Sequence, residues 1–192
     1  MKDFLAIGPF NAVHYKQVFP LIKAGTVHLG AGGRIPAFTV LGGEERKFGN
    51  TIWFTTLSHD HINPPLMLTA TYTPEAYPKY DNYDAIEVSR TKDIPRDYYG
   101  VMGVPLTFIE RWCPEQFEIV GITAHWSELR TKRYGMVDIV HPDGRRTRHD
   151  SLDAGAAVEV AEPPAGWACY VAGGRLYIGL YIRLLVRRKK LE

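Results

Sequence analysis

The chain has 192 residues, of which 45% are apolar and 12% aromatic, enough to bury one core of ordinary domain size. Charged residues make up 23% of the chain and the net charge is +2, so the composition excludes a disordered protein and does not by itself indicate a nucleic-acid partner. Only Cys113 and Cys169 are present, which excludes a disulfide framework and a zinc site built on cysteine. No apolar run approaches the ~20 residues of a membrane span. We therefore expect one folded domain over residues 1–192, cytoplasmic and without membrane contact.

The first predicted elements are a strand and a helix. Residues 4–8 form a short apolar run that predicts a buried strand leading into a loop. Residues 13–22 then have the apolar spacing of a helix, in which Pro20 can introduce a kink and after which Gly25 is well placed to end it. Residues 26–29 resume as a strand, so the chain opens with a strand, loop, helix unit.

A hairpin and an irregular arm are expected next. The β-prone runs at residues 35–40 and 50–57 flank a turn at residues 41–44 and predict two paired strands. Residues 58–100 are dense in Tyr, Asp and Pro and hold only short β-like runs. This stretch predicts an ordered but irregular arm over the core, with its tyrosines half-buried.

The remainder of the chain predicts strands and two further hairpins. Residues 103–109 begin a strand or a short helix, and residues 117–121 alternate as a strand. One hairpin has its turn and its basic return strand at residues 143–148. The other turns at residues 173–174 into a long strand that ends in the cations of residues 187–190.

Two segments resemble the loops with which an amino methyltransferase binds its methyl donor and its base. Residues 27–33 are a strand followed by glycines, but the β-prone residues after them do not begin the helix that such a cofactor loop requires, so a turn between strands is favoured. Asn63-Pro64-Pro65-Leu66 begins like an adenine-binding Asn-Pro-Pro-aromatic loop. Leucine in the fourth position cannot stack on a base, and a proline-stiffened loop is the favoured interpretation.

Metal binding and nucleophilic catalysis have little support in the sequence. His59, Asp60 and His61 offer ordinary ligand types, but no third spaced partner accompanies them, and solvent-exposed loop histidines are favoured. Cys113 lies between Trp112 and Pro114, which favours a packed thiol over a reactive one. There is no Gly-x-Ser-x-Gly elbow.

Basic side chains gather in the second half of the chain, at Arg130, Lys132, Arg133, Arg145, Arg146 and Arg148. If Asp143-Gly144 is a hairpin tip, three of these arginines project near its end, in a shape that can reach phosphates or a groove. A solvated charged hairpin is the alternative, and the sequence leaves both open. For residues 187–190 a solubilising tail is favoured over a phosphate contact.

Several long strings resemble the EcoRI-type adenine-specific DNA methyltransferases. The likeness begins in residues 4–8, 11–16 and 19–23 and continues through 29–30 and 48–55. Its most specific part is Tyr-Pro-Lys-Tyr-Asp-Asn-Tyr-Asp-Ala-Ile at residues 77–86, followed by residues 92–95, 100–105 and 114–121. A weaker echo at residues 181–187 resembles the last strand of the family.

The resemblance implies an α/β fold, in which this chain supplies the later-strand half of a Rossmann-like methyltransferase sheet, mixed and β-rich with antiparallel hairpins. Residues 1–121 would form the family-like part, and residues 122–190 would add basic hairpins and the last strand within the same domain. The methyl-donor loop and the Asn-Pro-Pro-Phe loop of the family lie upstream of the stretch that this chain resembles. We therefore expect no catalytic residue, no cofactor-binding residue and no metal site in this chain.

The implied activity is a site-specific, S-adenosylmethionine-dependent DNA adenine-N6 methyltransferase of the restriction-modification type, to which this portion contributes scaffold and DNA contacts. Double-stranded DNA and the N-terminal methyltransferase half are the expected partners, and no S-adenosylmethionine is expected to bind this chain alone. The alternative is a stand-alone, non-catalytic DNA-binding or interaction module from a split methyltransferase gene. An unrelated small enzyme has no convergent acid, base and nucleophile to support it. The expected DNA contacts are Asn11, Tyr15, Lys16, Arg145, Arg146 and Arg148.

Overall fold

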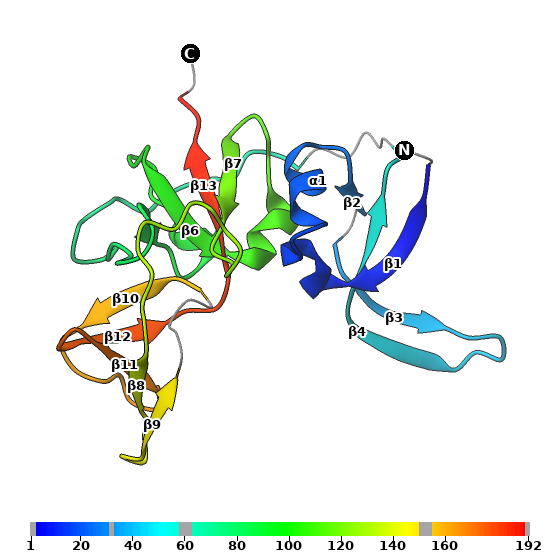
Figure 1. The fold of residues 1–192 in the computed structure, drawn as a ribbon. Coiled ribbons are helices and arrows are strands. Elements are labelled where there is room, and N and C mark those ends of the chain that lie inside the picture. The colour runs from blue at the N-terminus through cyan, green and yellow to red at the C-terminus, as the bar shows by residue number, and fades with distance from the viewer. Residues whose placement is uncertain (1–2, 31–32, 58–62, 150–154, 191–192) are drawn as a thin grey trace. The chain divides into compact units, whose positions relative to one another are not determined.

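The computed structural model describes residues 3–30, 33–57, 63–149 and 155–190, and the chain divides into two compact units, residues 1–63 and 64–192. Each unit is built mainly from β-strands (Figure 1). The β-rich character, the mixed sheet and the antiparallel hairpins expected from the sequence are confirmed. A single domain over residues 1–192 stays a prediction.

One antiparallel sheet forms the N-terminal unit, with β4 (Glu45–Thr55) at its centre. Strand β1 (Leu5–Pro9) pairs along one side of β4, and β2 (His28–Leu29) and β3 (Ile35–Thr39) pair along the other. The predicted hairpin is confirmed, and β3 and β4 extend as a two-stranded ribbon (Figure 1). Strand β4 begins ahead of the predicted start at Asn50, because Gly49 takes a φ of +72° that lets the strand continue through an irregularity in its pairing.

The predicted helix forms as two short pieces, the 3-10 helix η1 (Phe10–His14) and α1 (Phe19–Lys23). Pro20 stands in the first turn of α1, where its missing N–H costs no hydrogen bond, and Gly25 follows with a φ of +67°. The core of this unit consists of apolar side chains from the helices and β4: Phe10, Val13, Phe19, Ile22, Ile52 and Phe54.

The prediction that residues 4–8 form a buried strand is wrong in one respect. The strand is present, but Leu5 is 57% and Ile7 43% exposed. Their exposure shows that no described element covers the sheet faces from which these side chains project, and β1 is also the edge strand of its sheet.

Two sheets build the C-terminal unit. The four-stranded sheet has the order β5 (Ile86–Glu87), β6 (Val101–Pro105), β13 (Arg183–Arg188) and β7 (Phe117–Ile122). Its β5–β6 pair is parallel, and the other pairs are antiparallel. The 3-10 helices η2 (Thr91–Asp93) and η3 (Leu106–Arg111) belong to the connections around it. Residues 103–109, predicted as a strand or a helix, are thus the end of β6 followed by η3.

The second sheet of this unit is antiparallel throughout. Its order is β10 (Ala157–Val160), β12 (Arg175–Gly179), β11 (Cys169–Ala172), β8 (Val137–Val140) and β9 (Arg146–His149). Both predicted hairpins, β8–β9 and β11–β12, are confirmed.

The long strand predicted after residues 173–174 is wrong, because the chain changes sheets. Strand β12 ends at Gly179, after which the Leu180 N–H donates to the carbonyl of Ala156 at 2.8 Å. The chain then resumes as β13 at Arg183 in the other sheet. One apolar run in the sequence therefore serves two sheets.

The sequence predicts the irregular arm over residues 58–100, of which 58–62 lie outside the described residues. Residues 64–100 form such an arm, but its central tyrosines are buried and not half-buried. Tyr77, Tyr80 and Tyr83 lie in the core, and each hydroxyl has an acceptor. Tyr77 donates to the Asp93 carbonyl at 2.8 Å, Tyr83 to a backbone carbonyl, and Tyr80 to the Glu87 carboxylate. A phenol with a satisfied hydroxyl can be buried at low cost, which explains the difference.

A buried ion pair connects β5 to β13. Arg183 donates two hydrogen bonds to Glu87, from Nη2 to Oε1 at 3.0 Å and from Nε to Oε2 at 3.2 Å. The two side chains are only 15% and 7% exposed. Tyr80, whose pKa is raised well above its ordinary value by burial and by the Glu87 charge, remains a neutral donor to the same carboxylate.

Candidate nucleic-acid interface

In the N-terminal unit, the three predicted contact residues lie on the exposed surface around η1. Asn11 is in η1, and its Oδ1 accepts a hydrogen bond from Asn50 Nδ2 at 3.4 Å. Arg34 Nη1 donates to Asn50 Oδ1, also at 3.4 Å. Tyr15 and Lys16 follow η1 directly and are exposed. Asn11, Tyr15 and Lys16 are therefore close together because they are near neighbours in sequence. Hydrogen bonds connect Asn11 to Asn50 and Asn50 to Arg34 beside them.

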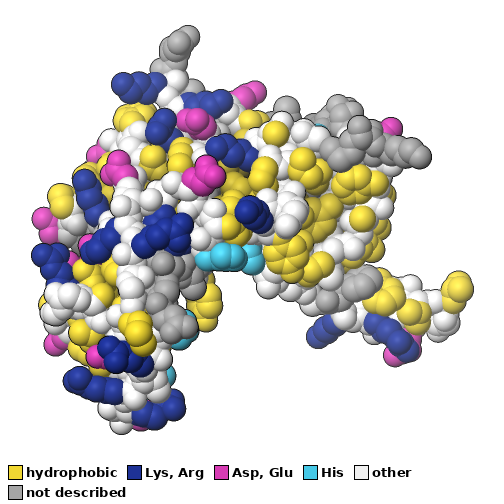
Figure 2. Space-filling view, in the orientation of Figure 1, with side chains coloured by type: hydrophobic (Ala, Val, Ile, Leu, Met, Phe, Trp, Pro, Cys, Tyr) yellow, Lys and Arg dark blue, Asp and Glu magenta, His cyan; other side chains and the backbone are white. Residues whose placement is uncertain are grey.

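The three predicted arginines of the C-terminal unit lie along the returning half of the β8–β9 hairpin: Arg145 and Arg146 are at its turn, whereas Arg148 is opposite Asp138, near the other end of the hairpin. Gly144 has a φ of +81°, as the tight turn requires, and the Arg145 N–H donates to Asp143 Oδ1 at 3.0 Å. Arg146 and Arg148 are two residues apart in β9, so their side chains leave the strand on the same face. Basic side chains are spread over the visible face of this unit down to the hairpin (Figure 2).

These arginines are only weakly engaged with acids. Arg145 Nε is 3.9 Å from Asp143, and Arg148 Nε is 3.8 Å from Asp138, with all of these side chains exposed. Arg146 has no acidic partner among the described residues. Exposed pairs at such distances are worth ~0–1 kcal/mol, so an incoming phosphate can compete for each guanidinium.

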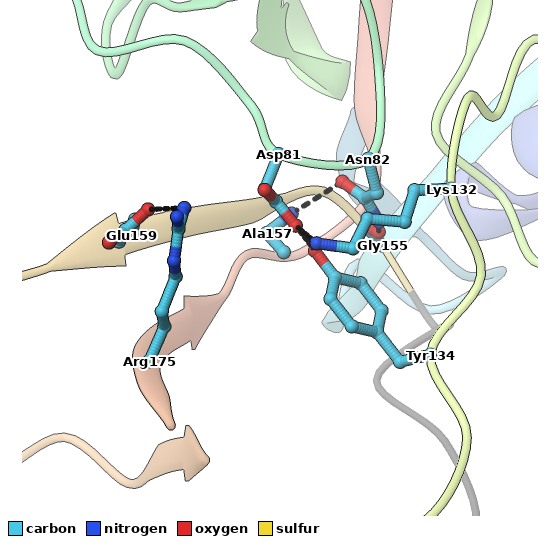
Figure 3. A network of polar contacts seen from close by, with 8 residues as sticks. All are labelled: Asp81, Asn82, Lys132, Tyr134, Gly155, Ala157, Glu159 and Arg175. Atoms are coloured by element: carbon cyan, nitrogen blue, oxygen red, sulfur yellow. Dashed lines mark hydrogen bonds and ion pairs between the residues drawn. The ribbon is translucent and has the colours of Figure 1, made fainter. Parts of the chain in front are cut away.

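Other cations of the predicted basic group have structural roles. Lys132 Nζ and the Tyr134 hydroxyl both donate to Asp81 Oδ2 at 2.5 Å (Figure 3). Burial alone would raise the pKa of Asp81, but these two hydrogen bonds lower it below its ordinary value. Arg130 Nη2 donates to the Ala124 carbonyl at 3.2 Å. Lys132 and Arg130 therefore stabilise the fold through hydrogen bonds and are not added to the exposed arginines of the β8–β9 hairpin.

The same network anchors the arm to the antiparallel sheet. Asn82 Oδ1 accepts from the Ala157 N–H at 2.8 Å, and Asn82 Nδ2 donates to the Gly155 carbonyl at 2.9 Å (Figure 3). Because Asn82 is fully buried, both ends of its amide need such partners. The most specific string of the sequence resemblance thus has a packing role here.

The two loop segments singled out from the sequence have structural roles at their described residues; residues 31–32 of the first segment lie outside these. The Gly30 N–H donates to the Trp53 carbonyl at 3.0 Å, and a Cβ on Gly30 would stand 2.7 Å from Trp53 Cβ. Close packing between strands therefore requires glycine there, and strand β3 follows in place of a helix. Leu66, which follows the two prolines, is bound through its backbone to the side chain of Gln116.

The remaining candidates yield no reactive group in the described part of the chain. Cys113 and Cys169 are both buried, and burial raises the pKa of the Cys169 thiol. His59, Asp60 and His61 lie outside the described residues, and the described ones hold no cluster of three or more metal-ligating side chains. No helix among the described residues is long and apolar enough to cross a membrane.

Sequence reasoning missed one arrangement of polar and aromatic side chains. Arg188 and Tyr99, together with Arg96, line an open pocket in the C-terminal unit. The sequence predicts a tail for the cations at residues 187–190, but Arg187 and Arg188 are inside β13. The one sequence feature that indicates a strand at Arg187 and Arg188 is the apolar run at residues 184–186 directly before them.

Taken together, the fold and these surfaces define a β-rich protein with exposed cationic and amide side chains, which suit a polyanionic ligand. The chain matches the family described as "Adenine-specific methyltransferase EcoRI" over residues 1–189 and belongs to that family. The resemblance inferred from residues 4–121 is thereby confirmed and extends over nearly the whole chain.

Curated relatives carry the same family character. The chain is 44% identical to the Type II methyltransferase M.EcoRI of Escherichia coli over 138 residues, which cover 62% of this chain and 42% of that protein. It is 34% identical to the Type II methyltransferases M.MgeORF184P of Mycoplasma genitalium and M.MpnI of Mycoplasma pneumoniae, over 65% of this chain and 45% of each relative. The matches thus span less than half the length of these relatives. No solved structure matches the chain.

Proposed function

We propose that this chain is part of a cytoplasmic, site-specific DNA adenine-N6 methyltransferase of the restriction-modification type, which uses S-adenosylmethionine as methyl donor. In this proposal the chain supplies scaffold and DNA contacts, and the methyl donor and the target adenine bind elsewhere in the enzyme. The observation that carries the proposal is the family match over residues 1–189.

The scaffold role is supported by the exposed apolar side chains of the N-terminal unit. Phe4, Leu5 and Ile7 are all exposed on or beside the edge strand β1. Hydrophobic side chains gather on the visible face of this unit (Figure 2). An edge strand with apolar side chains is suited to pair with a further strand and to be covered by it. We propose that the N-terminal methyltransferase half provides that cover and that both parts complete one Rossmann-like sheet.

The DNA-contact role is supported by the β8–β9 hairpin. A two-stranded ribbon with exposed arginines at its turn and along its returning strand has a shape that reaches phosphates or enters a groove. Asn11, Tyr15 and Lys16 are the proposed contacts of the N-terminal unit. Their hydroxyl, amide and ammonium groups can all bond to phosphate oxygens.

Methyl transfer by the complete gene product tests the activity. The enzyme is incubated with labelled S-adenosylmethionine and adenine-containing duplexes, and N6-methyladenine is quantified by mass spectrometry. Transfer to one short sequence is the expected result. If no duplex is methylated while the purified chain still binds DNA, the alternative of a non-catalytic DNA-binding module replaces the proposal.

A charge-removing triple substitution tests the hairpin separately. Arg145→Gln, Arg146→Gln and Arg148→Gln together should weaken binding to duplex DNA and lower the slope of log Kd against log salt by ~0.9 for each phosphate that the protein no longer neutralises. Arg175→Gln is the matched control, since this exposed arginine of the same sheet is paired with Glu159 at 3.1 Å. A slope equal to that of the wild type would refute the hairpin contact.

A further inference from the structure

The C-terminal unit contains an open pocket of about 500 Å³ at the end of β13. Its wall is built by long-range contacts between the arm and the four-stranded sheet. Gln116 Oε1 accepts from the Leu66 N–H at 2.7 Å, and Gln116 Nε2 donates to the Leu66 carbonyl at 2.8 Å. The Lys189 N–H in turn donates to the Gln116 carbonyl at 2.9 Å. These bonds hold the arm beside β13 and form one wall of the pocket.

Arg188, the last residue of β13, lines this pocket and has no polar partner in the part of the chain that the structure describes. Its guanidinium carbon lies 5.1 Å from the centre of the Tyr99 ring, and its Nη1 is buried. Within the described part of the chain, the guanidinium has no hydrogen bond and no carboxylate. A guanidinium is always charged and carries five donors, so a half-buried one without acceptors is primed to accept an anion. Turning toward a ligand would cost Arg188 no existing hydrogen bond.

The neighbouring side chains add to the positive charge of the pocket. Arg96 also lines it, is exposed, and has no ion pair among the described residues. Lys190 Nζ lies 5.9 Å from the centre of the Tyr99 ring. The one acidic lining residue, Asp97, already accepts a hydrogen bond from the Tyr72 N–H at 2.8 Å. Cations therefore outnumber acids around the pocket.

The donor types match one kind of anion. A guanidinium group offers planar, forked donors that can bind two oxygens of one phosphate, and Tyr99, which is 42% exposed and carries a phenol hydroxyl, lines the same pocket as the two arginines. Tyrosine hydroxyls and arginines are both frequent donors to the DNA backbone.

We propose that this pocket binds a backbone phosphodiester of duplex DNA, through Arg188 and Arg96 with Tyr99 beside them. The inference rests on the proposed function, which supplies DNA as the ligand. It adds a contact site on the four-stranded sheet, separate from the β8–β9 hairpin.

Salt-dependent binding of a short fluorescein-labelled duplex to the full 192-residue chain tests the proposal. Arg188→Gln and Arg96→Gln should each lower the slope of log Kd against log salt by ~0.9, whereas Arg188→Lys, which keeps the charge, should keep the slope. Arg187→Gln is the matched control. Arg187 is next to Arg188 in β13, faces the opposite side of the strand and pairs with Glu118 at 3.5 Å, so its removal should leave the slope unchanged.

The outcomes separate this proposal from the proposed function. Because Arg96 is exposed, its variant remains informative even if Arg188→Gln does not fold. Duplex binding by the wild type with unchanged slopes in the Arg188 and Arg96 variants overturns the pocket assignment alone. Absence of any duplex binding overturns the pocket assignment and also the DNA-contact role of this chain, whereas the methyltransferase activity is tested by methyl transfer. A second experiment is calorimetric titration with inorganic phosphate at constant ionic strength. If phosphate binds saturably, Arg188→Gln abolishes that binding, and the same variant leaves the salt slope of DNA binding unchanged, the pocket binds free phosphate and the DNA contact is overturned.

Discussion

Replacing Arg183 by Met should strongly destabilise the C-terminal unit. Arg183→Met removes the only cationic partner that Glu87 has among the described residues and leaves its carboxylate 7% exposed in the four-stranded sheet. Breaking a buried ion pair from one side costs ~3–5 kcal/mol, because the remaining charge is desolvated without compensation. Glu87 retains the hydrogen bonds from Tyr80 and Ser89, so the lower end of that range, about 3 kcal/mol, is expected.

Urea unfolding followed by circular dichroism measures this destabilisation. With a slope of ~2 kcal/mol/M, a decrease of about 3 kcal/mol shifts the midpoint by ~1.5 M. Arg187→Met is the control: its pair with Glu118 is half-exposed, and the expected change is within ~0.5 kcal/mol. The double variant Glu87→Gln with Arg183→Met should recover at least ~1 kcal/mol, because no unpaired charge remains. If Arg183→Met unfolds at the same urea concentration as Arg187→Met, the buried pair is not a stabilising element and the reasoning fails.

Three further predictions concern the arm, the glycine segment and the edge strand. The pKa of Asp81 is lowered in the folded state, so its contribution to stability is present above its unfolded pKa of ~3.9 and disappears as the pH falls through the folded value. Asp81→Asn should therefore lower the free energy of unfolding by about 1 kcal/mol at neutral pH. In acid, the unfolding curves of this variant and of the wild type should converge. Calorimetric titration of the purified chain with S-adenosylmethionine should show no binding, because the element that follows Gly30 is strand β3 and not a helix. A measurable heat of binding would contradict the interpretation of residues 27–33 as a turn between strands. The double variant Leu5→Asp with Ile7→Asp should keep the fold of the chain but abolish its co-purification with a co-expressed N-terminal methyltransferase half. Leu41→Asp, at an exposed turn, is the control and should still co-purify. If both variants co-purify with equal amounts of the N-terminal half, the docking role of β1 is refuted.

The parts of the fold that the sequence predicts are those decided by local chemistry. Asp143-Gly144 forms the hairpin turn because glycine takes a φ of +81° without strain. Gly25 follows α1 for the same reason. Residues 117–121 alternate as a half-buried strand does, and β7 forms over Phe117–Ile122. In each case a few neighbouring residues contain all the information that the structure uses.

The features that sequence reasoning missed depend on contacts between distant segments. Whether residues 175–188 form one strand or two is decided by the bond from Leu180 to Ala156 and by the pairing of β13 with β6 and β7. The exposure of Leu5 depends on what lies beside the sheet edge. The pocket at Arg188 exists because Gln116 binds the backbone of Leu66, far away in the sequence. Neither periodicity nor turn chemistry contains these pairings.

The same limit applies to the basic residues, whose roles are decided by their acidic partners. Arg183 and Lys132 each have a carboxylate at hydrogen-bonding distance, and that partner is part of the framework. Arg146 and Arg188 have none among the described residues, although the sequence presents all four as similar cations. A cation already neutralised inside the fold gains little from a phosphate, whereas an unneutralised one gains a charge-assisted bond. The cations proposed as DNA contacts are therefore those that the fold leaves unpaired among the described residues, Arg146 and Arg188, or only weakly paired, Arg145 and Arg148.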